Sequence, residues 1–430
     1  MLSASEQEHY RIVRVRARQV LDSRGNPTVE VDVCTRNVCG RAAAPSGASR
    51  GAHEAFELRD GDPKLFHGKS VLKAVRNVNE IIAPNLVGMD VRYQQKIDQT
   101  LIELDGTPNK SRLGGNAIVA TSLAAAKAAA AALNIPLYLY IGGVGDFSLP
   151  VPLMNLINGG LHAGNELTFQ EFLVIPIGAE RFSEALRMAV EIYHTLKDIL
   201  KSIYGPGAVN VGDEGGFAPP MKKNEEALEA LAKAIGAAGY VLGEDVVLGL
   251  DVAASHIFDS RRRTYRVDGR SFTSEELQDY YTEIAERYSI KILEDPFHEE
   301  DVESFRNITN KLRNKLIIVG DDLFATSVKR LESLGKGVAS GAIVKVNQAG
   351  TLTEALNFAR KVSNYSMKVV VSHRSGETED TAIAHIAVGL RADFVKMGAP
   401  ARGERTAKYN ELLRVEEHIG PKYAGRRVFS

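Results

Sequence analysis

Short apolar runs that end on a charged or polar residue recur through the second half of this chain. Intervals of 23 to 43 residues separate the end residues, which are Asp251, Glu294, Asp321, Lys345, His373 and Lys396. Each interval is long enough for one helix and its two connections, and residues 274–288 and 350–362 have helical patterning. Buried strands that alternate with helices predict parallel βα units. If these strands close into a barrel, the six end residues meet at its mouth, where such barrels carry their active sites.

Three of these end residues are carboxylates, and together they suggest a metal site. Asp251, Glu294 and Asp321 offer hard oxygen ligands of the kind that magnesium prefers while it keeps positions for water or substrate. The group contains no cysteine and no closely spaced pair of histidines, so zinc is the weaker prediction. One such acid alone is more simply a helix cap or an ion-pair partner. Three acids at successive strand ends favour a bound divalent cation.

The two lysines of the group have two interpretations each. Lys345 can act as a base if neighbouring cations or burial lower its pKa from the unperturbed value of about 10.4. Lys396 can bind the anionic part of a substrate. Either lysine can instead form an ion pair with one of the acids, and for each lysine taken alone this is the simpler interpretation. The whole group indicates acid–base chemistry on an anionic substrate that binds together with divalent cations.

Further polar residues lie in loops beside the predicted strands. His373, Arg374 and Ser375 are adjacent in the chain, and this combination suits a phosphate or carboxylate because arginine offers paired hydrogen bonds. A solvated loop is the alternative interpretation. The other polar loops contain His162, the pair Gln170 and Glu171, and the adjacent acids Asp213 and Glu214.

The first part of the chain predicts an α+β domain. Residues 11–23 and 27–35 alternate apolar and polar residues on either side of an Arg-Gly-Asn turn, so they predict an antiparallel hairpin. Helical patterns follow, including an alanine-rich run at 116–134 with high helix propensity. We place the domain boundary near Gly142, which divides the chain into an N-terminal domain at 1–141 and a barrel domain at 142–430.

Overall composition excludes some functions and leaves others open. The formal net charge is -1, which gives no electrostatic case for binding nucleic acid or an anionic membrane. No segment approaches the roughly 18 uninterrupted apolar residues of a membrane span, and the first residues lack the apolar core of a signal peptide. A cytoplasmic protein is the simplest prediction. Cys34 and Cys39 could form a bridge, but reduced thiols are the preferred interpretation.

Many short motifs follow one another along essentially the whole chain: LDSRGNPTVEVDV, APSGAS, NGGLHAGNE, FQEF, VGDEGGFAP, LDVAAS, LEDPF, VGDDL, KVNQAGTL, SHRSGETEDT and KMGAPARGER. In their sequences and their order they resemble one family, the enolases. The resemblance implies an α/β fold in which an N-terminal α+β domain caps a TIM-like barrel that starts with two strands and two helices. It also implies the reversible dehydration of 2-phosphoglycerate to phosphoenolpyruvate.

The resemblance further implies two magnesium ions in each active site. Asp251, Glu294 and Asp321 would hold the first ion. Ser49 and the substrate phosphate would help to hold the second, with residues 44–51 acting as a lid.

By the same resemblance, Lys345 would take the proton from carbon 2. Glu214 would act as the acid on the departing hydroxyl group, with Glu171 and Gln170 nearby. The remaining matched residues would bind substrate, with Lys396 facing its carboxylate, Arg374 and Ser375 facing its phosphate, and His162 and His373 lining the pocket.

The family resemblance also implies a homodimer or a larger homo-oligomer, and it allows surface or secreted pools besides the cytoplasmic one. Two positions near the proposed site depart from the family pattern: Arg50 stands where threonine is usual and His256 where glutamate is common. Two alternatives are a related enzyme that removes an α-proton from another carboxylic acid, and a binding or scaffold protein that has lost turnover. Every catalytic residue type of the enolases is present, which favours the active enzyme.

Overall fold

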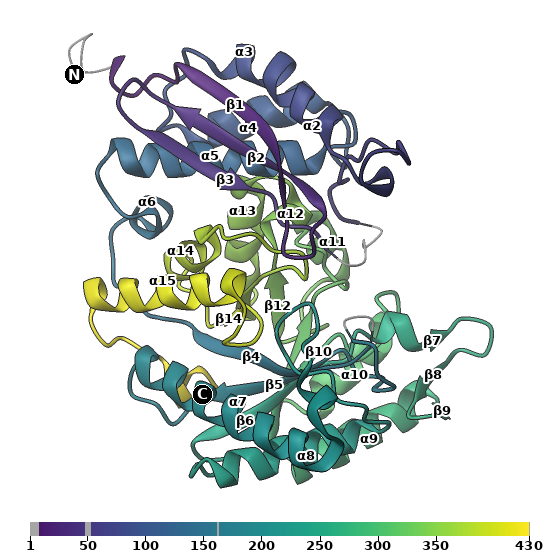
Figure 1. Ribbon diagram of the computed structural model, residues 1–430. Coiled ribbons are helices and arrows are strands. Elements are labelled where there is room, and N and C mark those ends of the chain that lie inside the picture. Colours follow the sequence, from purple (N-terminus) through teal and green to yellow (C-terminus); the bar gives the residue numbers. More distant parts are fainter. Residues whose placement is uncertain (1–7, 48–52, 161–162, 430) are drawn as a thin grey trace.

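A small antiparallel sheet forms the outer layer of the N-terminal domain (Figure 1). The computed structural model describes residues 8–47, 53–160 and 163–429. The sheet has the order β1 (Arg14–Leu21), β2 (Pro27–Cys34) and β3 (Cys39–Ala43). The Asp22 carboxylate accepts the backbone N–H groups of Arg24 and Asn26 at 2.9 Å each, which stabilises the turn between β1 and β2. The predicted hairpin is therefore confirmed, while β3 was not predicted.

Helices pack on one face of this sheet, and the longest of them is the predicted alanine-rich helix. Its close approach to the sheet requires a glycine, because a Cβ at Gly40 would lie 2.2 Å from the carbonyl oxygen of Ala124 and from the nitrogen of Ala128. The helical elements of this domain are η1 (Phe66–Gly68), α2 (Leu72–Arg76), η2 (Asn77–Ile82), α3 (Ala83–Leu86), α4 (Gln94–Asp105), α5 (Gly115–Ala132) and α6 (Leu137–Gly142).

Both cysteines of the chain form a disulfide, so the prediction of reduced thiols is wrong. Cys34 ends β2 and Cys39 begins β3, and the two residues are direct partners across the antiparallel pair. Their Cα atoms lie 4.0 Å apart. Because β3 was not predicted, no pairing of strands indicated that the two side chains face each other.

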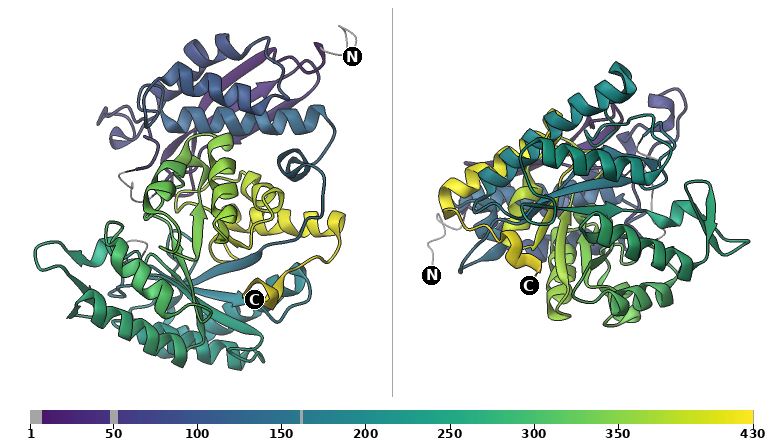
Figure 2. Two further views of the ribbon diagram at one scale, coloured as in Figure 1. Left: turned by 180° about the vertical axis from the view of Figure 1, so that it is seen from behind. Right: turned by 90° about the horizontal axis from the view of Figure 1, so that it is seen from below.

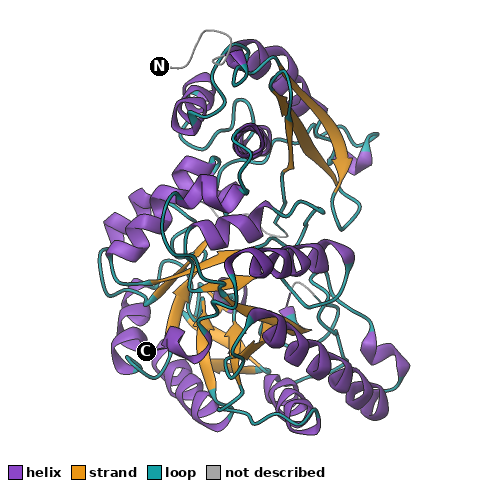
Figure 3. Cartoon of the chain, turned by 90° about the vertical axis from the view of Figure 1, so that its left-hand side faces the viewer, coloured by secondary structure: helices purple, strands orange, loops and turns teal. Residues whose placement is uncertain are grey.

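The rest of the chain forms a closed barrel, as predicted. Figures 1 and 3 show the strands of this barrel from two sides. Around the ring they follow the order β10-β11-β12-β13-β14-β4-β5-β6. Adjacent strands are parallel except at β5, which runs antiparallel to both of its neighbours. The strands are β4 (Val151–Asn158), β5 (Glu171–Pro176), β6 (Val246–Asp251), β10 (Ile290–Glu294), β11 (Ile317–Gly320), β12 (Gly341–Val344), β13 (Lys368–Ser372) and β14 (Phe394–Lys396).

Helices surround the barrel (Figure 2). Two of these helices begin at a Thr-x-x-Glu sequence, and their N-terminal caps differ. At α9 (Ser274–Arg287), the Thr273 side chain accepts the backbone N–H of Glu276, and the Glu276 side chain accepts the backbone N–H of Thr273, which is a complete capping box. At α13 (Leu352–Asn364), the Thr351 side chain accepts the backbone N–H of Glu354. The Glu354 carboxylate instead accepts hydrogen bonds from the Thr351 hydroxyl and from Lys110. The helices are α7 (Phe182–Tyr204), α8 (Asn224–Ala237), α9 (Ser274–Arg287), α10 (Val302–Lys311), α11 (Val328–Leu334), α12 (Val346–Ala349), α13 (Leu352–Asn364), α14 (Ala382–Gly389) and α15 (Gly403–Ile419), with the short turns η4 (Pro206–Val209), η5 (Ala254–Ile257) and η6 (Gly425–Phe429).

A second small sheet projects from the barrel between β6 and α9 and was not predicted (Figure 1). It comprises β7 (Phe258–Asp259), β8 (Thr264–Val267) and β9 (Arg270–Phe272). Asp268 and Gly269 make its second turn with positive φ angles of 49° and 79°. An Asp-Gly pair between short strands is typical of a hairpin. The hairpin of β8 and β9 could therefore have been predicted from the sequence.

The two domains meet through α4 and α5 on one side and the mouth of the barrel on the other. Ion pairs cross this boundary from Lys127 to Asp380 at 2.7 Å and from Lys110 to Glu354 at 2.6 Å. The division near Gly142 remains a prediction. No helix in the described part of the chain combines the length and apolar character needed to span a membrane.

Candidate active site

The six strand-end residues predicted from the sequence all lie at the mouth of the barrel. Three are the last residues of their strands, at β6, β10 and β14, and the other three directly follow β11, β12 and β13. Five line one cavity, and the sixth, Glu294, contacts it through Lys396. The structure therefore brings together residues that lie up to 145 positions apart in the chain.

The reversed strand β5 brings a further pair of predicted residues to the same place. Glu171 begins β5 and is paired with Asn158 at the end of β4 and with Asp251 at the end of β6. Gln170 precedes it and donates a hydrogen bond from Nε2 to Asp251 Oδ2 at 3.3 Å. In an all-parallel barrel the first residue of a strand would lie at the end of the barrel opposite the mouth. The reversal of β5 is therefore what brings Glu171 to the cavity.

Lys396 is the electrostatic centre of the cavity. Its Nζ atom lies 2.8 Å from Asp251 Oδ2, 2.8 Å from Glu294 Oε2 and 3.1 Å from Glu171 Oε1. Burial would lower the pKa of Lys396, but the surrounding carboxylates outweigh it and hold that pKa well above the ordinary value. Burial raises the pKa of Glu294 to about 8 and that of Glu171 well above its usual range. The single positive charge of Lys396 therefore does not balance the negative charge of three buried carboxylates.

Lys345 forms a second ion pair in the cavity, with Asp321. Burial alone would lower the pKa of Lys345, but the negative charge of Asp321 raises it. The opposite oxygen of Asp321 accepts a hydrogen bond from Gln348 Nε2 at 3.0 Å. The Lys345 backbone N–H is held by the hydroxyl of Thr326 at 3.0 Å. The lysine is thus fixed both at its backbone and at its charged end.

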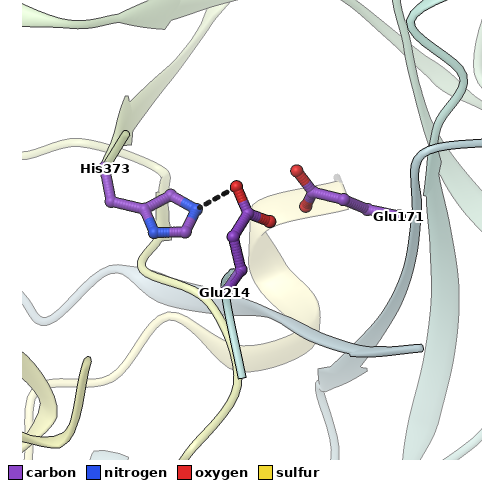
Figure 4. A group of neighbouring side chains, drawn as sticks. All are labelled: Glu171, Glu214 and His373. Carbon is purple, nitrogen blue, oxygen red and sulfur yellow. Dashed lines mark ion pairs between the residues drawn. The ribbon is translucent and has the colours of Figure 1, made fainter. Parts of the chain in front are cut away.

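Glu214 and His373 face Glu171 from the loops above the barrel (Figure 4). His373 Nε2 lies 3.7 Å from Glu214 Oε1, and Asn155 Nδ2 donates to Glu214 Oε2 at 3.0 Å. Burial lowers the pKa of His373 well below the ordinary histidine value. Asn155 lies inside β4, and nothing in the sequence pattern pointed to it.

Arg374 and Ser375 also line the cavity, as predicted. Arg374 is buried, and its Nη1 lies 2.9 Å from Glu54 Oε2 and 3.2 Å from Asn347 Oδ1. Glu54 comes from the N-terminal domain, so both domains contribute to the site. Sequence reasoning missed Glu54 because it lies in an irregular segment without a strand before it. The predicted residues Ser49 and His162 lie outside the described residues.

Two further acids adjoin the site, Asp295 and Asp322. Asp295 has a positive φ of 40° and accepts the backbone N–H groups of Asp321 and Asp322 at 2.9 and 2.8 Å. Burial raises the pKa of Asp322 to about 7. Neither acid was predicted as a site residue. Both could have been found from the sequence, because each directly follows a predicted metal ligand in the chain.

The donor set fits hard divalent cations. Seven carboxylates line the cavity against two lysines and one arginine, an excess of buried negative charge that requires protons or cations. Within the described ranges, Glu294 Oε1 and Glu171 Oε2 are buried without a hydrogen-bond partner. Among the same residues, two groups of acids or histidine have ligand atoms within 4.8 Å of one another: Glu171 with Glu214 and His373, and Asp295 with Asp321 and Asp322. The predicted set of Asp251, Glu294 and Asp321 is not one of these groups.

Comparisons with known proteins agree with this architecture. A family model described as the enolase N-terminal domain matches residues 12–141, and one described as the enolase C-terminal TIM barrel domain matches residues 146–430. The chain belongs to the enolase family. Membership makes it an enzyme, a lyase of the hydro-lyase class, and confirms the fold of a small α+β domain followed by an α/β barrel.

Enolases from three archaea illustrate the similarity. The enolase of Pyrococcus furiosus is 56% identical over 97% of this chain and 98% of its own length. The enolase of Methanocaldococcus jannaschii is 55% identical over the same shares. That of Methanosarcina barkeri is 54% identical over 96% of this chain and 95% of its own.

Proposed function

We propose that this enolase catalyses the reversible, magnesium-dependent dehydration of 2-phosphoglycerate to phosphoenolpyruvate in glycolysis and gluconeogenesis. The observation that carries the proposal is that Lys345 and Glu171, with Glu214 beside it, come from opposite sides of one barrel and line the same cavity. Lys345 follows β12, and β5, which carries Glu171 next to Glu214, lies four strands away in the ring of eight. A substrate between them can lose a proton to one side and a hydroxyl group to the other.

Lys345 is the proposed base. It takes the proton from carbon 2, and the electron pair of that C–H bond becomes the new double bond to carbon 3. A proton next to a carboxylate is weakly acidic because its removal concentrates negative charge on that carboxylate. Asp251, Glu294 and Asp321 would hold a divalent cation, which when bound would supply positive charge to stabilise that carboxylate. Asp321 would then be shared between Lys345 and the cation, which would favour loss of the proton from Lys345. Lysine bases with magnesium are a general pattern cited for the enolase superfamily.

Glu214 is the proposed acid. It gives its proton to the hydroxyl group on carbon 3 as the C–O bond breaks, so that water leaves and Glu214 remains as a carboxylate. Glu171 and Gln170 lie beside the same position. Water exclusion favours this transfer, because Glu214 and Glu171 are both buried.

The cationic groups of the cavity orient the substrate. Lys396 faces the carboxylate in our proposal, and Arg374 with Ser375 faces the phosphate, where a guanidinium group can donate two hydrogen bonds. His373 and His162 complete the pocket. Ser49 would contribute to a second magnesium ion, with residues 44–51 as the lid. Action in the cytoplasm as a homodimer or larger assembly is part of the proposal and rests on family membership alone.

The first test is the formation of phosphoenolpyruvate from 2-phosphoglycerate, followed by ultraviolet absorbance with magnesium and with a chelator. We expect Lys345→Met to lower kcat by about 100- to 10,000-fold, as for loss of a general base. Lys315→Met is the matched control, since Lys315 pairs with Glu286 at the exposed surface. Native protein that is folded and loaded with magnesium but gives no product would contradict the proposal.

Hydrogen exchange at carbon 2 separates the two proposed roles. In deuterated water, Lys345→Met should lose exchange of the carbon-2 proton. Glu214→Gln should retain that exchange and lose dehydration, because proton removal precedes the step that needs the acid. If both variants lose exchange of the carbon-2 proton equally, the assignment of Lys345 as the base and Glu214 as the acid is wrong.

A further inference from the structure

Arg405 is the largest of the fully buried side chains in the described part of the chain, and the proposed reaction gives it no role. It lies in the first turn of α15 and reaches two loops at the mouth of the barrel. Its guanidinium group donates to the carbonyl oxygens of Arg374 at 2.8 Å, Ser375 at 2.7 Å and Asp213 at 3.0 Å. It therefore joins the loop that carries Glu214 to the loop that carries His373.

The fourth contact of Arg405 is with the imidazole ring of His373. Arg405 Nη1 lies 2.5 Å from His373 Nδ1. A guanidinium group has donors only and stays charged at any pH that a protein experiences. His373 Nδ1 must therefore accept this hydrogen bond, so in the neutral ring the proton is on Nε2.

His373 Nε2 is the nitrogen that points at Glu214 (Figure 4). It is buried and has no hydrogen-bond partner among the residues that the structure describes. With its proton on this atom, the ring offers Glu214 an N–H group and has no lone pair for a cation. The group of Glu171, Glu214 and His373 is thus unsuited to hold a metal ion, although its atoms lie close enough.

We propose that Arg405 is a positioning residue that locks His373 as the neutral ring with its proton on Nε2, so that His373 and Asn155 both direct N–H groups at Glu214. This inference rests on the proposed function and deepens it. The carboxylate that remains on Glu214 after proton release faces two N–H groups, which stabilise its charge. Loss of Arg405 would free the ring to turn a lone pair toward the acid.

The charged groups around His373 support a ring that stays neutral. Burial is the main reason for its low pKa, and the cations of Arg405, Lys396 and Lys345 act in the same direction. Glu214 is the charged group that opposes them. Protonation of Nδ1 would also break the contact with Arg405.

Nitrogen NMR of the native enzyme labelled with ¹⁵N-histidine tests the assignment without any substitution of Arg405. The signals of His373 are identified by their loss in His373→Gln. We expect a protonated Nε2 and an unprotonated, hydrogen-bonded Nδ1, unchanged from about pH 5.5 to pH 8. A proton on Nδ1, or an ordinary histidine titration in this range, would overturn the inference.

Variants of Arg405 test the consequence for catalysis. In Arg405→Gln the new side chain is neutral and can accept hydrogen bonds as well as donate them, so it no longer holds His373 in one protonation state. We expect kcat to fall by about tenfold or more and the pH–rate profile to show the ionisation of a histidine. Arg405→Lys should recover part of kcat and remove that ionisation. Arg402→Gln is the matched control, because Arg402 binds the Gly212 carbonyl of the same loop without touching His373.

The two proposals fail in different ways. Native enzyme that makes no phosphoenolpyruvate would reject the proposed function, and the NMR result would still decide the role of Arg405. If Arg405→Gln fails to fold, the native spectrum decides the assignment alone. A folded Arg405→Gln variant with an unaltered pH–rate profile would overturn the positioning role.

Discussion

Glu294 shows how single residues at the mouth of the barrel are held under electrostatic stress. One of its oxygens contacts Lys396 at 2.8 Å, and the other is buried with no partner in the described part of the chain. Burial raises its pKa to about 8, and the neighbouring Glu171 is shifted in the same direction. Without a cation, the folded protein therefore keeps protons that the unfolded chain releases at about pH 4.3.

This proton uptake predicts how the stability of the metal-free protein depends on pH. The folded state binds more protons than the unfolded state between about pH 4.3 and pH 8, so stability falls as pH rises through that window. For Glu294 alone, whose pKa is raised to about 8, we expect a loss on the order of 5 kcal/mol, measured by denaturant unfolding in a chelator. Magnesium should restore more stability at about pH 8 than at about pH 6.

The control for this prediction is Glu294→Gln, which removes the ionisation while it keeps the size of the side chain. Its metal-free stability should depend less on pH, and magnesium should stabilise it less. A native protein whose metal-free stability is constant across this window would show that Glu294 ionises at an ordinary pKa.

At the level of the elements, periodicity predicted the regular part of the fold and missed the irregular parts. The strands that end near Asp321, Lys345 and His373 were predictable because each is a short apolar run followed by a helix. Strand β3 has only five residues, with glycine and arginine among them, so it has no clear apolar alternation. The reversal of β5 follows from pairing with its neighbours and was available only through the family resemblance.

The disulfide is the clearest consequence of an element that was missed. It closes a loop of only a few residues between β2 and β3, so its effect on the entropy of the unfolded chain is modest. We expect the replacement of both Cys34 and Cys39 by serine to lower the free energy of unfolding by about 2 kcal/mol. Thermal unfolding with and without reductant measures this effect.

Two comparisons make that test specific. Reductant should lower the unfolding temperature of the native chain and leave that of the double variant unchanged. Activity should remain in both proteins, since the bridge lies in the N-terminal sheet away from the cavity residues. An unfolding temperature that does not respond to reductant would show that the two thiols are free in solution.

On the scale of the whole molecule, the two domains are joined by buried polar contacts. Asp98 on α4 is fully buried and accepts the hydroxyl of Ser122 at 2.6 Å and the Nε2 of Gln94 at 3.0 Å. It also accepts the backbone N–H and hydroxyl of Thr353, at the start of α13, at 2.9 and 2.6 Å. One carboxylate thus connects the N-terminal domain to the barrel.

This contact predicts that the two domains unfold together. Scanning calorimetry of the native protein should give one transition. Asp98→Ala leaves several buried donors unsatisfied, and we expect a loss of about 2 to 4 kcal/mol together with a separate, earlier transition of the N-terminal domain. Glu103→Ala, on an exposed part of the same helix, is the control. A single transition in Asp98→Ala would show that other contacts suffice to couple the domains.

The domain boundary also limits what the sequence could show about the site. Residues at strand ends were predictable, because the barrel topology places such ends together. Glu54 and Asn155 were not, since one reaches the cavity from the other domain and the other lies inside a strand. Their positions depend on how the two domains pack, and no local pattern records that packing.

The reversed strand β5 also determines the direction of a helix. Because β5 ends with Pro176 beside the start of β6, α7 leaves from the far end of the barrel and ends at Tyr204, before the loop that carries Glu214. On the other side, α13 and α14 begin at the mouth, after β12 and β13. Helix starts carry about half a positive charge and helix ends about half a negative one. Helix α7 thus turns its negative end toward the mouth, whereas α13 and α14 turn their positive ends toward it.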